Sequence, residues 1–339
     1  MDGGCKGRSG LPNFKTSITA DRFGDAAIRD DRKGISMRHL LTLEELERTA
    51  LTRLLDRAER FRTEGAPREL LAGRTVLTLF FEPSTRTRTS FVLASKRLGA
   101  DTLNFNLSHS STSKGESLLD TLHTLEAMGL DALVVRHNEN GMPAYLAQHA
   151  NSHVSIINAG DGTHAHPTQG LLDALTIRQR RRDLENLHVV ICGDIRHSRV
   201  ARSDARALHT LGVRDIRLCA PHAMLPESPD DFPDCASTED FDAALAGADV
   251  VIMLRIQRER MAAAQFPEAA DYHARYGLDT RRLALAKPDC QVLHPGPINR
   301  GIEIAPEVAD GAQSRILDQV ANGVATRMAV LAELLATPA

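Results

Sequence analysis

Residues 75–98 have the sequence TVLTLFFEPSTRTRTSFVLASKRL, which predicts a β-strand that leads directly into an α-helix. The strand is expected over Thr75–Phe80, a run of β-branched and apolar residues that is typical of buried strands. From Thr87 to Leu98, apolar residues recur at helical spacing. Because strands that alternate with helices form parallel sheets, this stretch indicates an α/β fold.

The same alternation continues along the rest of the chain. The other short β-rich segments lie at 101–106, 131–135, 154–158, 188–192, 216–220, 250–254 and 291–293. Helical patterns separate them, for example over 117–128. We therefore expect two domains, each an open, mainly parallel sheet flanked by helices, with bridging helices that join the two.

Three longer segments have helical periodicity. Residues 42–61 are expected to form an amphipathic helix, with Thr42 and Glu45 as a capping box at its start. A helix over 166–182 would join the two sheets, and a last helix is expected over about 314–335. Four prolines within 221–235 predict a surface loop.

The composition excludes several classes of protein. The chain has 339 residues, and its net charge of −3 provides no field that would attract nucleic acid or an anionic membrane. No apolar run approaches the roughly 18 residues of a membrane span, and the first 37 residues lack the apolar core of a secretory signal, so a cytoplasmic location is expected. Five cysteines without a CxxC pair, and histidines without ligand spacing, predict neither a disulfide framework nor a metal site.

The junction between the first strand and its helix is rich in hydrogen-bond donors. Ser84, Thr85 and Thr87 are interleaved with Arg86 and Arg88. Open α/β sheets bind ligands at the carboxyl ends of strands, and a helix N-terminus attracts anions. A Ser/Thr helix cap followed by a solvated helix face is the alternative interpretation. Two arginines among the hydroxyls favour a phosphate site.

Four separated motifs resemble those of the aspartate/ornithine carbamoyltransferase family. The run STRTR at 84–88 is similar to the family's carbamoyl phosphate signature, and HAHPTQ at 164–169 to its His-Pro-x-Gln motif. RIQRER at 255–260 is similar to the Arg-x-Gln-x-Glu-Arg of the aspartate branch. The Ser-Met-Gly and His-Cys-Leu-Pro of the ornithine branch do not occur, and HPGP stands at 294–297. The motifs follow the family's order from about residue 38 to 335.

The resemblance implies an enzyme without a cofactor that transfers the carbamoyl group of carbamoyl phosphate to the amine of L-aspartate. The products would be N-carbamoyl-L-aspartate and phosphate, in the committed step of pyrimidine synthesis. Both substrates are anionic, and concentrated cationic donors suit them. Since the motifs contain no obvious general base, the departing phosphate is the expected proton acceptor.

The resemblance also implies which residues bind carbamoyl phosphate. His166, Arg136 and Thr87 would polarise its carbonyl and stabilise the oxyanion, and Gln169 would accept a hydrogen bond from the amide. Arg86 and Lys114 complete the implied catalytic set. The residues implied to bind carbamoyl phosphate are Ser84, Thr85, Arg86, Thr87, Ser110, Lys114, Arg136, His166, Gln169, Gly296 and Pro297.

For the second substrate, the resemblance implies Arg199 at the α-carboxylate of aspartate and Arg255 with Gln257 at the β-carboxylate. Because these residues would bind two carboxylates, ornithine should be excluded as a substrate. Ser110 and Lys114, the latter also implied to bind aspartate, match a loop that in the family enters the active site of the neighbouring subunit. The implied assembly is therefore a homotrimer with shared active sites, although a lysine in a serine-rich loop is ordinarily only a solvated residue.

The expected organisation is a polar extension over 1–37, a carbamoyl phosphate-binding domain over 38–180 plus 313–339, and an aspartate-binding domain over 181–312. The extension resembles that of longer family members that associate with dihydroorotase or a dihydroorotase-like chain. Two alternatives remain open. One is a carbamoyltransferase for another amine such as ornithine; the other is a non-catalytic assembly subunit, which should have lost motif residues, although none is lost here.

Overall fold

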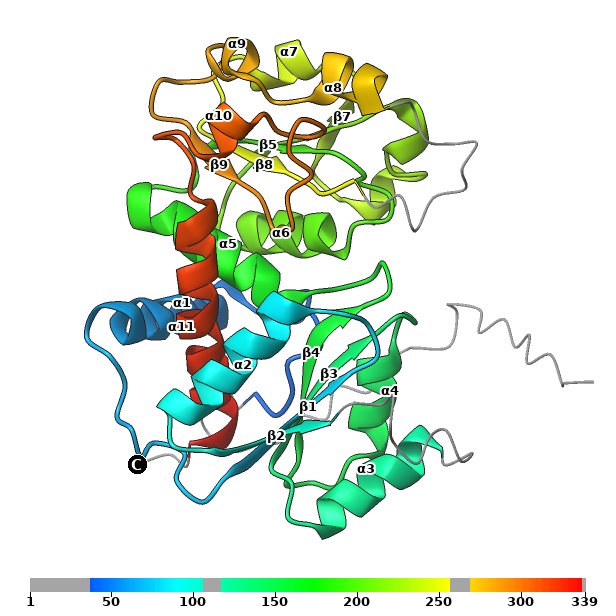
Figure 1. Ribbon diagram of the computed structural model, residues 1–339, viewed down its shortest axis with the longest axis vertical. Helices are drawn as coiled ribbons and strands as arrows, with labels where there is room; N and C mark the ends of the chain where they lie inside the picture. The colour runs from blue at the N-terminus through cyan, green and yellow to red at the C-terminus, as the bar shows by residue number, and fades with distance from the viewer. Residues whose placement is uncertain (1–36, 106–116, 257–268, 337–339) are drawn as a thin grey trace, which may run out of the picture. The chain divides into compact units, whose positions relative to one another are not determined.

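The computed structural model describes residues 37–105, 117–256 and 269–336. Within these ranges the chain forms two parallel sheets flanked by helices, which confirms the predicted fold class (Figure 1). The first sheet has the strand order β2-β1-β3-β4 and the second β7-β6-β5-β8-β9. Every strand pair in both sheets is parallel.

The strands coincide closely with the β-rich segments of the sequence. The first sheet contains β1 (Thr75–Phe80), β2 (Asp101–Phe105), β3 (Ala132–His137) and β4 (Ser155–Asp161). The second contains β5 (His188–Cys192), β6 (Asp215–Cys219), β7 (Ala236–Thr238), β8 (Val250–Met253) and β9 (Gln291–Leu293). The sequence analysis missed β7, because this three-residue strand at the sheet edge is mostly exposed and has no apolar pattern.

Helices follow most of the strands. The longer ones are α1 (Arg48–Thr63), α2 (Thr85–Arg97), α3 (Leu118–Ala127), α4 (Met142–His149), α5 (Pro167–Arg180), α6 (Arg199–Thr210), α8 (Ala269–Tyr276) and α11 (Ile316–Leu335). The shorter ones are α7 (Phe241–Leu245), α9 (Thr280–Leu283) and α10 (Pro306–Ala309). The proline-rich loop at 221–235 contains two single 3₁₀ turns, His222–Met224 and Pro229–Asp231.

Two helices connect the two sheets. Helix α5 is buried without a break from Pro167 to Arg178. It packs against α1, α6 and α11, and α11 in turn packs against α1, α2 and β9 (Figure 1). A helix that is covered on all sides must satisfy most of its polar side chains internally. Gln169, Asp173 and Thr176 of α5 have protein hydrogen-bond partners, whereas the Thr168 hydroxyl has none within the described residues.

The predicted start of the first helix was wrong. The helix begins at Arg48, not at Thr42, and the expected capping box between Thr42 and Glu45 does not form. Instead, Leu40 forms a bridge with Ile157 of β4, so the chain must turn before it can enter the helix. The Thr42 hydroxyl accepts a hydrogen bond from the Glu44 N–H at 3.3 Å within this turn. Pairing with the sheet therefore overrides the local helix signal.

Within the described ranges 37–105, 117–256 and 269–336, no helix combines the length and the apolar content needed to cross a membrane. In the same ranges, no three side chains of the types His, Cys, Asp and Glu gather as a set of metal ligands.

The contact between α5 and α6 yields a stability prediction. A Cβ atom on Gly170 would lie 2.6 Å from the Ser203 carbonyl oxygen, which backbone packing holds in place. Gly170→Ala should therefore lower the free energy of unfolding by about 1–3 kcal/mol, as measured in urea. In an uncrowded helix the same change would raise stability by up to about 1 kcal/mol, so a gain in stability would contradict the close approach of the two helices.

Candidate active site

The first group of candidate residues lies where β1 ends and α2 begins. Ser84 is the N-cap of α2, yet its side chain makes no capping hydrogen bond. Thr85 and Arg86 follow in the first turn, and Thr87 is buried. The unpaired N–H groups of the first turn, the Ser84 hydroxyl and the Arg86 guanidinium are thus suited to bind an anion at this helix end.

A single carboxylate joins the two halves of the candidate site. Glu82 Oε2 accepts a hydrogen bond from Arg136 Nε at 3.0 Å and another from Arg199 Nη2 at 2.7 Å. Arg136 belongs to β3 of the first sheet, and Arg199 is the first residue of α6. Glu82 therefore holds two cations together that come from parts of the chain built around different sheets.

The structure also fixes these two arginines through main-chain carbonyls. Arg136 Nη1 donates to the Ala159 oxygen at 3.4 Å, and Arg199 Nη1 to the Gly162 oxygen at 3.2 Å. Both carbonyls lie at the end of β4 or directly after it. Arg136 lies within β3, which ends at His137. The sequence analysis had ended this strand two residues earlier, at 135.

His166 lies beside these cations, at the start of α5. Its main-chain N–H donates to Ser203 Oγ at 2.9 Å, and its side chain is 4% exposed. Burial, together with the charges of Arg136, Arg199 and Arg327, lowers the pKa of His166 well below the ordinary 6.5. A neutral imidazole can still donate one hydrogen bond, which suits it to polarise a carbonyl oxygen.

Gln169 lies one turn further along α5. Its Nε2 atom donates to Asp173 Oδ1 at 3.1 Å and to Asp173 Oδ2 at 3.0 Å. Because the amide nitrogen is bound to Asp173, the Gln169 carbonyl oxygen is directed away from it and can accept from another group.

The loop after β9 contacts Arg86. Gly296 has a positive φ of 65°, and a Cβ atom on it would overlap the Arg86 guanidinium. The Gly296 N–H donates to His294 Nδ1 at 2.7 Å, and His294 Nε2 is 3.0 Å from Glu303 Oε1. A main-chain position without a side chain therefore lets Arg86 lie directly against this loop.

Arg255, two residues after β8, completes the group of cations. Partial burial and the charge of Arg255 lower the pKa of Arg86. Burial lowers the pKa of His294, and the charges of Arg86 and Arg255 contribute to that shift. These mutual effects indicate that the cations lie near one another, so the site combines strong positive charge with the single carboxylate of Glu82.

Several residues that the sequence analysis predicted for the site are not among those described above. Ser110, Lys114 and Gln257 fall in 106–116 and 257–268, outside the described residues. Pro297 follows Gly296 in the loop and is exposed. The sequence analysis missed Glu82 as a site residue. Glu82 lies two residues before Ser84, and a lone acid next to a motif that contains two arginines was a usable signal.

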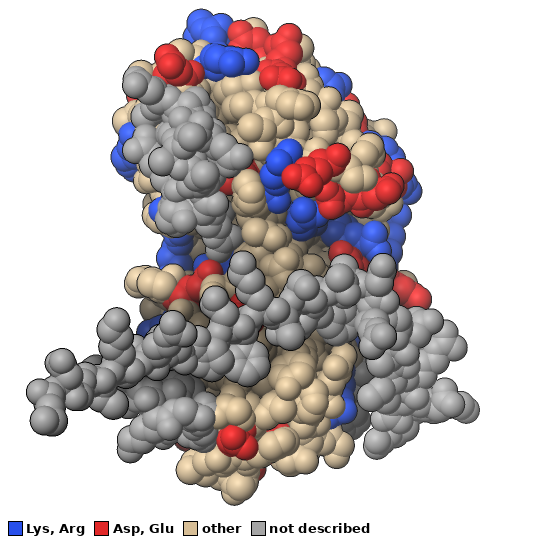
Figure 2. Space-filling model, turned by 90° about the vertical axis from the view of Figure 1, so that its right-hand side faces the viewer, with Lys and Arg blue, Asp and Glu red and all other residues tan. Residues whose placement is uncertain are grey.

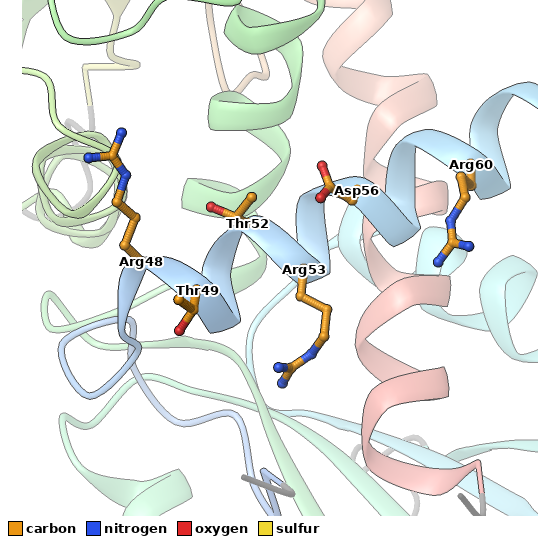
Figure 3. Close-up of a pocket in the computed structure, with 6 residues that line it drawn as sticks. All are labelled: Arg48, Thr49, Thr52, Arg53, Asp56 and Arg60. Carbon is orange, nitrogen blue, oxygen red and sulfur yellow. The ribbon is translucent and has the colours of Figure 1, made fainter. Parts of the chain in front are cut away.

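An open hollow on the outer face of α1 is separate from the candidate active site (Figure 3). It is lined by Arg48, Thr49, Thr52, Arg53, Asp56 and Arg60. Arg48 pairs with Glu185 at 2.8 Å, and Arg53 with Glu333 at 2.7 Å. On the face drawn in Figure 2, blue basic and red acidic side chains likewise lie next to each other over the upper part of the molecule. No residue of the candidate site lines this hollow.

Comparison with known proteins agrees with the geometry. The family model "Aspartate/ornithine carbamoyltransferase, carbamoyl-P binding domain" matches residues 38–179, and "Aspartate/ornithine carbamoyltransferase, Asp/Orn binding domain" matches 185–334. The chain therefore belongs to the aspartate/ornithine carbamoyltransferase family.

The similar curated proteins include the aspartate carbamoyltransferase catalytic subunit of Xanthomonas campestris pv. campestris (strain B100), which is 59% identical over 305 residues, 88% of this chain and 96% of the relative. The subunit of the same name from Stenotrophomonas maltophilia (strain R551-3) is 57% identical over 305 residues, which again cover 88% of this chain and 96% of the relative.

Solved structures with the same fold come from both branches of the family. Aspartate transcarbamoylase from Trypanosoma cruzi, in complex with carbamoyl aspartate and phosphate, has a TM-score of 0.80 at 31% identity and covers 88% of this chain and 96% of its own. Ornithine carbamoyltransferase from Thermus thermophilus has a TM-score of 0.79 at 27% identity, and the match covers 88% of this chain and 99% of that structure's chain.

The environment of His166 predicts its charge state. At pH 6.5 an unperturbed imidazole is half protonated, whereas His166 should be neutral because burial and nearby arginines oppose a further positive charge. Nitrogen NMR of ¹⁵N-histidine-labelled protein, with His166→Asn to assign the signal, measures this directly. Since the folded pKa is depressed, the linked contribution to stability is lost as pH falls below 6.5. A charged ring at pH 6.5 would refute the assignment.

The Glu82 bridge predicts a stability loss. Glu82→Gln should lower the free energy of unfolding by about 1–3 kcal/mol, because a neutral amide leaves Arg136 and Arg199 close together without their shared counter-charge. Glu227, whose pair with Arg196 is exposed, provides the matched control, and Glu227→Gln should change stability by less than about 0.5 kcal/mol. Equal effects in denaturant titrations would mean that the bridge contributes no more than a surface ion pair.

Proposed function

We propose that the chain transfers the carbamoyl group of carbamoyl phosphate to L-aspartate, giving N-carbamoyl-L-aspartate and phosphate, the committed step of pyrimidine synthesis. The observation that carries this proposal is the cluster formed by Arg86, Arg136, Arg199 and Arg255, with Glu82 between two of them. A site for two anionic substrates needs such a concentration of guanidinium groups. The names of the relatives at 57–59% identity support aspartate as the acceptor.

Carbamoyl phosphate would bind at the N-terminus of α2. Its phosphate would accept hydrogen bonds from Ser84, Thr85, Arg86 and Thr87, where the helix dipole also favours negative charge. The main chain of Gly296 and Pro297 would close the other side of this site, next to Arg86. The contact of Arg86 with Gly296 supports this pairing of motif and loop.

The carbonyl of the same substrate would face Arg136, His166 and Thr87. A neutral His166 donates one hydrogen bond, and Arg136 adds a charged donor, so negative charge that develops on the carbonyl oxygen is stabilised. Gln169 would accept from the carbamoyl NH₂ through its carbonyl oxygen, the orientation that its bonds to Asp173 impose.

Aspartate would bind through its two carboxylates. Arg199 would hold the α-carboxylate, while Arg255 and Gln257 would hold the β-carboxylate. This arrangement leaves the neutral amine free to attack the carbonyl carbon. A C–N bond forms, the tetrahedral intermediate collapses with cleavage of the C–O bond to phosphate, and the departing phosphate takes the amine proton. The protein thus contributes positioning and oxyanion stabilisation.

The assembly and organisation are also proposals. Ser110 and Lys114 would reach the site of a neighbouring subunit in a cytoplasmic homotrimer, with Lys114 contacting both substrates. The carbamoyl phosphate-binding domain would comprise 38–180 with 313–339, and the aspartate-binding domain 181–312. The extension over 1–37 would serve association with a dihydroorotase or a dihydroorotase-like chain.

An assay of the purified full-length chain tests the activity. Carbamoyl transfer should be detected with L-aspartate and be at least about a hundredfold weaker with L-ornithine, because the arginine cluster disfavours a second amine cation. Preferential transfer to ornithine would overturn the assignment in favour of another carbamoyltransferase. Absence of transfer with either amine, with and without cell extract, would favour a non-catalytic subunit.

A single substitution tests the aspartate side of the site. Arg255→Ala should raise the KM for aspartate at least about tenfold, because one charge-assisted contact to a carboxylate is lost. The matched control is Arg300→Ala, which removes an exposed arginine paired with Asp310. A KM for aspartate that stays the same in both variants would exclude Arg255 from the aspartate site.

A further inference from the structure

Two acidic side chains interact inside the protein, where α5 and α6 pack against each other. Asp173 belongs to α5 and Asp204 to α6, and each is 1% exposed. The two helices run side by side (Figure 1) and approach closely where Gly170 meets Ser203. Asp173 lies three residues after Gly170, and Asp204 directly follows Ser203, so the close approach brings the two carboxyl groups together.

Hydrogen bonding distinguishes the two carboxyls. Asp173 accepts from Gln169 Nε2 at 3.1 and 3.0 Å and from Gln319 Nε2 at 2.6 Å. Asp173 also interacts with the Asp204 side chain and with the charge of Arg327. Neither oxygen of Asp204 receives a hydrogen bond from any residue within the described ranges.

A buried carboxylate without donors is strongly disfavoured, and so are two carboxylates in contact. One proton on Asp204 removes both costs, because the resulting hydroxyl can donate to Asp173. Asp173 remains the ionised partner, since three amide contacts already stabilise its negative charge. Burial and the adjacent Asp173 raise the pKa of Asp204 well above its ordinary value.

The charges around the pair balance with one proton. Arg327 of α11 is 3% exposed and is attracted to Asp173. One guanidinium, one carboxylate and one neutral carboxylic acid give this buried group no net charge. With two ionised carboxyls the group would carry an uncompensated negative charge away from water.

Asp173 also connects the two sides of the candidate active site. Through Gln169 it reaches the start of α5, where His166 lies. Through Gln319 it reaches the loop after β9, because Gln319 Oε1 accepts from the His294 N–H at 2.9 Å. His294 in turn holds the Gly296 N–H next to Arg86.

We propose that Asp173 and Asp204 share one proton, carried on Asp204, and that Asp173 is a positioning residue that orients the amides of both Gln169 and Gln319. Its effect on catalysis rests on the proposed role of Gln169 in binding carbamoyl phosphate. An amide whose nitrogen is held by a carboxylate does not flip, so the Gln169 carbonyl oxygen stays directed at the substrate.

Infrared spectroscopy of the full-length protein tests the shared proton. At neutral pH the C=O stretch of a protonated carboxylic acid should be present, and it should shift when aspartate is labelled with ¹³C at the side-chain carboxyl. Asp204→Asn should remove this band, because the proton is carried on Asp204 and three amide contacts keep Asp173 ionised. Asp173→Asn should shift the band rather than remove it, because Asp204 stays buried without donors and its hydroxyl then faces a neutral amide. A band that persists unchanged in Asp204→Asn, or that is missing from the unsubstituted protein, would overturn the shared proton.

Kinetics test the positioning role. Asp173→Leu should raise the KM for carbamoyl phosphate at least about tenfold, whereas Asp173→Asn, which keeps an acceptor oxygen, should stay within about threefold. Thr176→Val is the matched control: it removes another buried polar group of α5, one bonded to Asn322 of α11, without touching Gln169. Equal changes in the leucine variant and the control would mean only a packing defect and would overturn the positioning role.

Failure of the proposed function has a different signature. Gln169→Ala would then leave the KM for carbamoyl phosphate unchanged, while the infrared band would still report the shared proton. If Asp173→Leu does not fold, the Asp204→Asn spectrum and the Asp173→Asn kinetics still decide the proposal. Loss of the band in Asp204→Asn together with nearly unchanged kinetics in Asp173→Asn supports it. A tenfold rise in KM for Asp173→Asn contradicts it.

Discussion

The carboxylate of Glu82 is the contact on which the candidate site depends. It lies 3.0 Å from Arg136 Nε and 2.7 Å from Arg199 Nη2. Like charges in a partly buried setting repel strongly unless an opposite charge separates them. Glu82 therefore allows cations from the two halves of the chain to remain close together, and the same cluster is then able to attract anions.

Helix α5 extends this arrangement into the core. His166, Gln169 and Asp173 follow one another at spacings of three and four residues, which places them on one side of the helix. His166 and Gln169 lie toward the arginines, and Asp173 lies deeper, between α6 and α11. A helix that is buried along most of its length thus carries a polar row from the site to the interior, where every group needs a protein partner.

Much of the fold follows from local sequence, because buried strands are short apolar runs whose pattern does not depend on distant residues. Strands β1, β5 and β9 coincide with their predicted bounds. The start of α1 could not be predicted, since the pairing of Leu40 with β4 involves residues far apart in the chain. For the candidate site, the motifs identified Arg86, Arg136, His166 and Arg199, but Asp173 and Asp204 had the pattern of ordinary helix residues.

The sequence by itself determined the fold class, the family and the types of side chain that gather at the carboxyl ends of the strands. Motif spacing and hydrophobic periodicity contain that information because both are local. Only the tertiary structure decided that Glu82 lies between two arginines 54 and 117 residues further along, and that Asp204 faces Asp173. Charge pairing and the sharing of a proton depend on distances between remote parts of the chain, which packing alone sets.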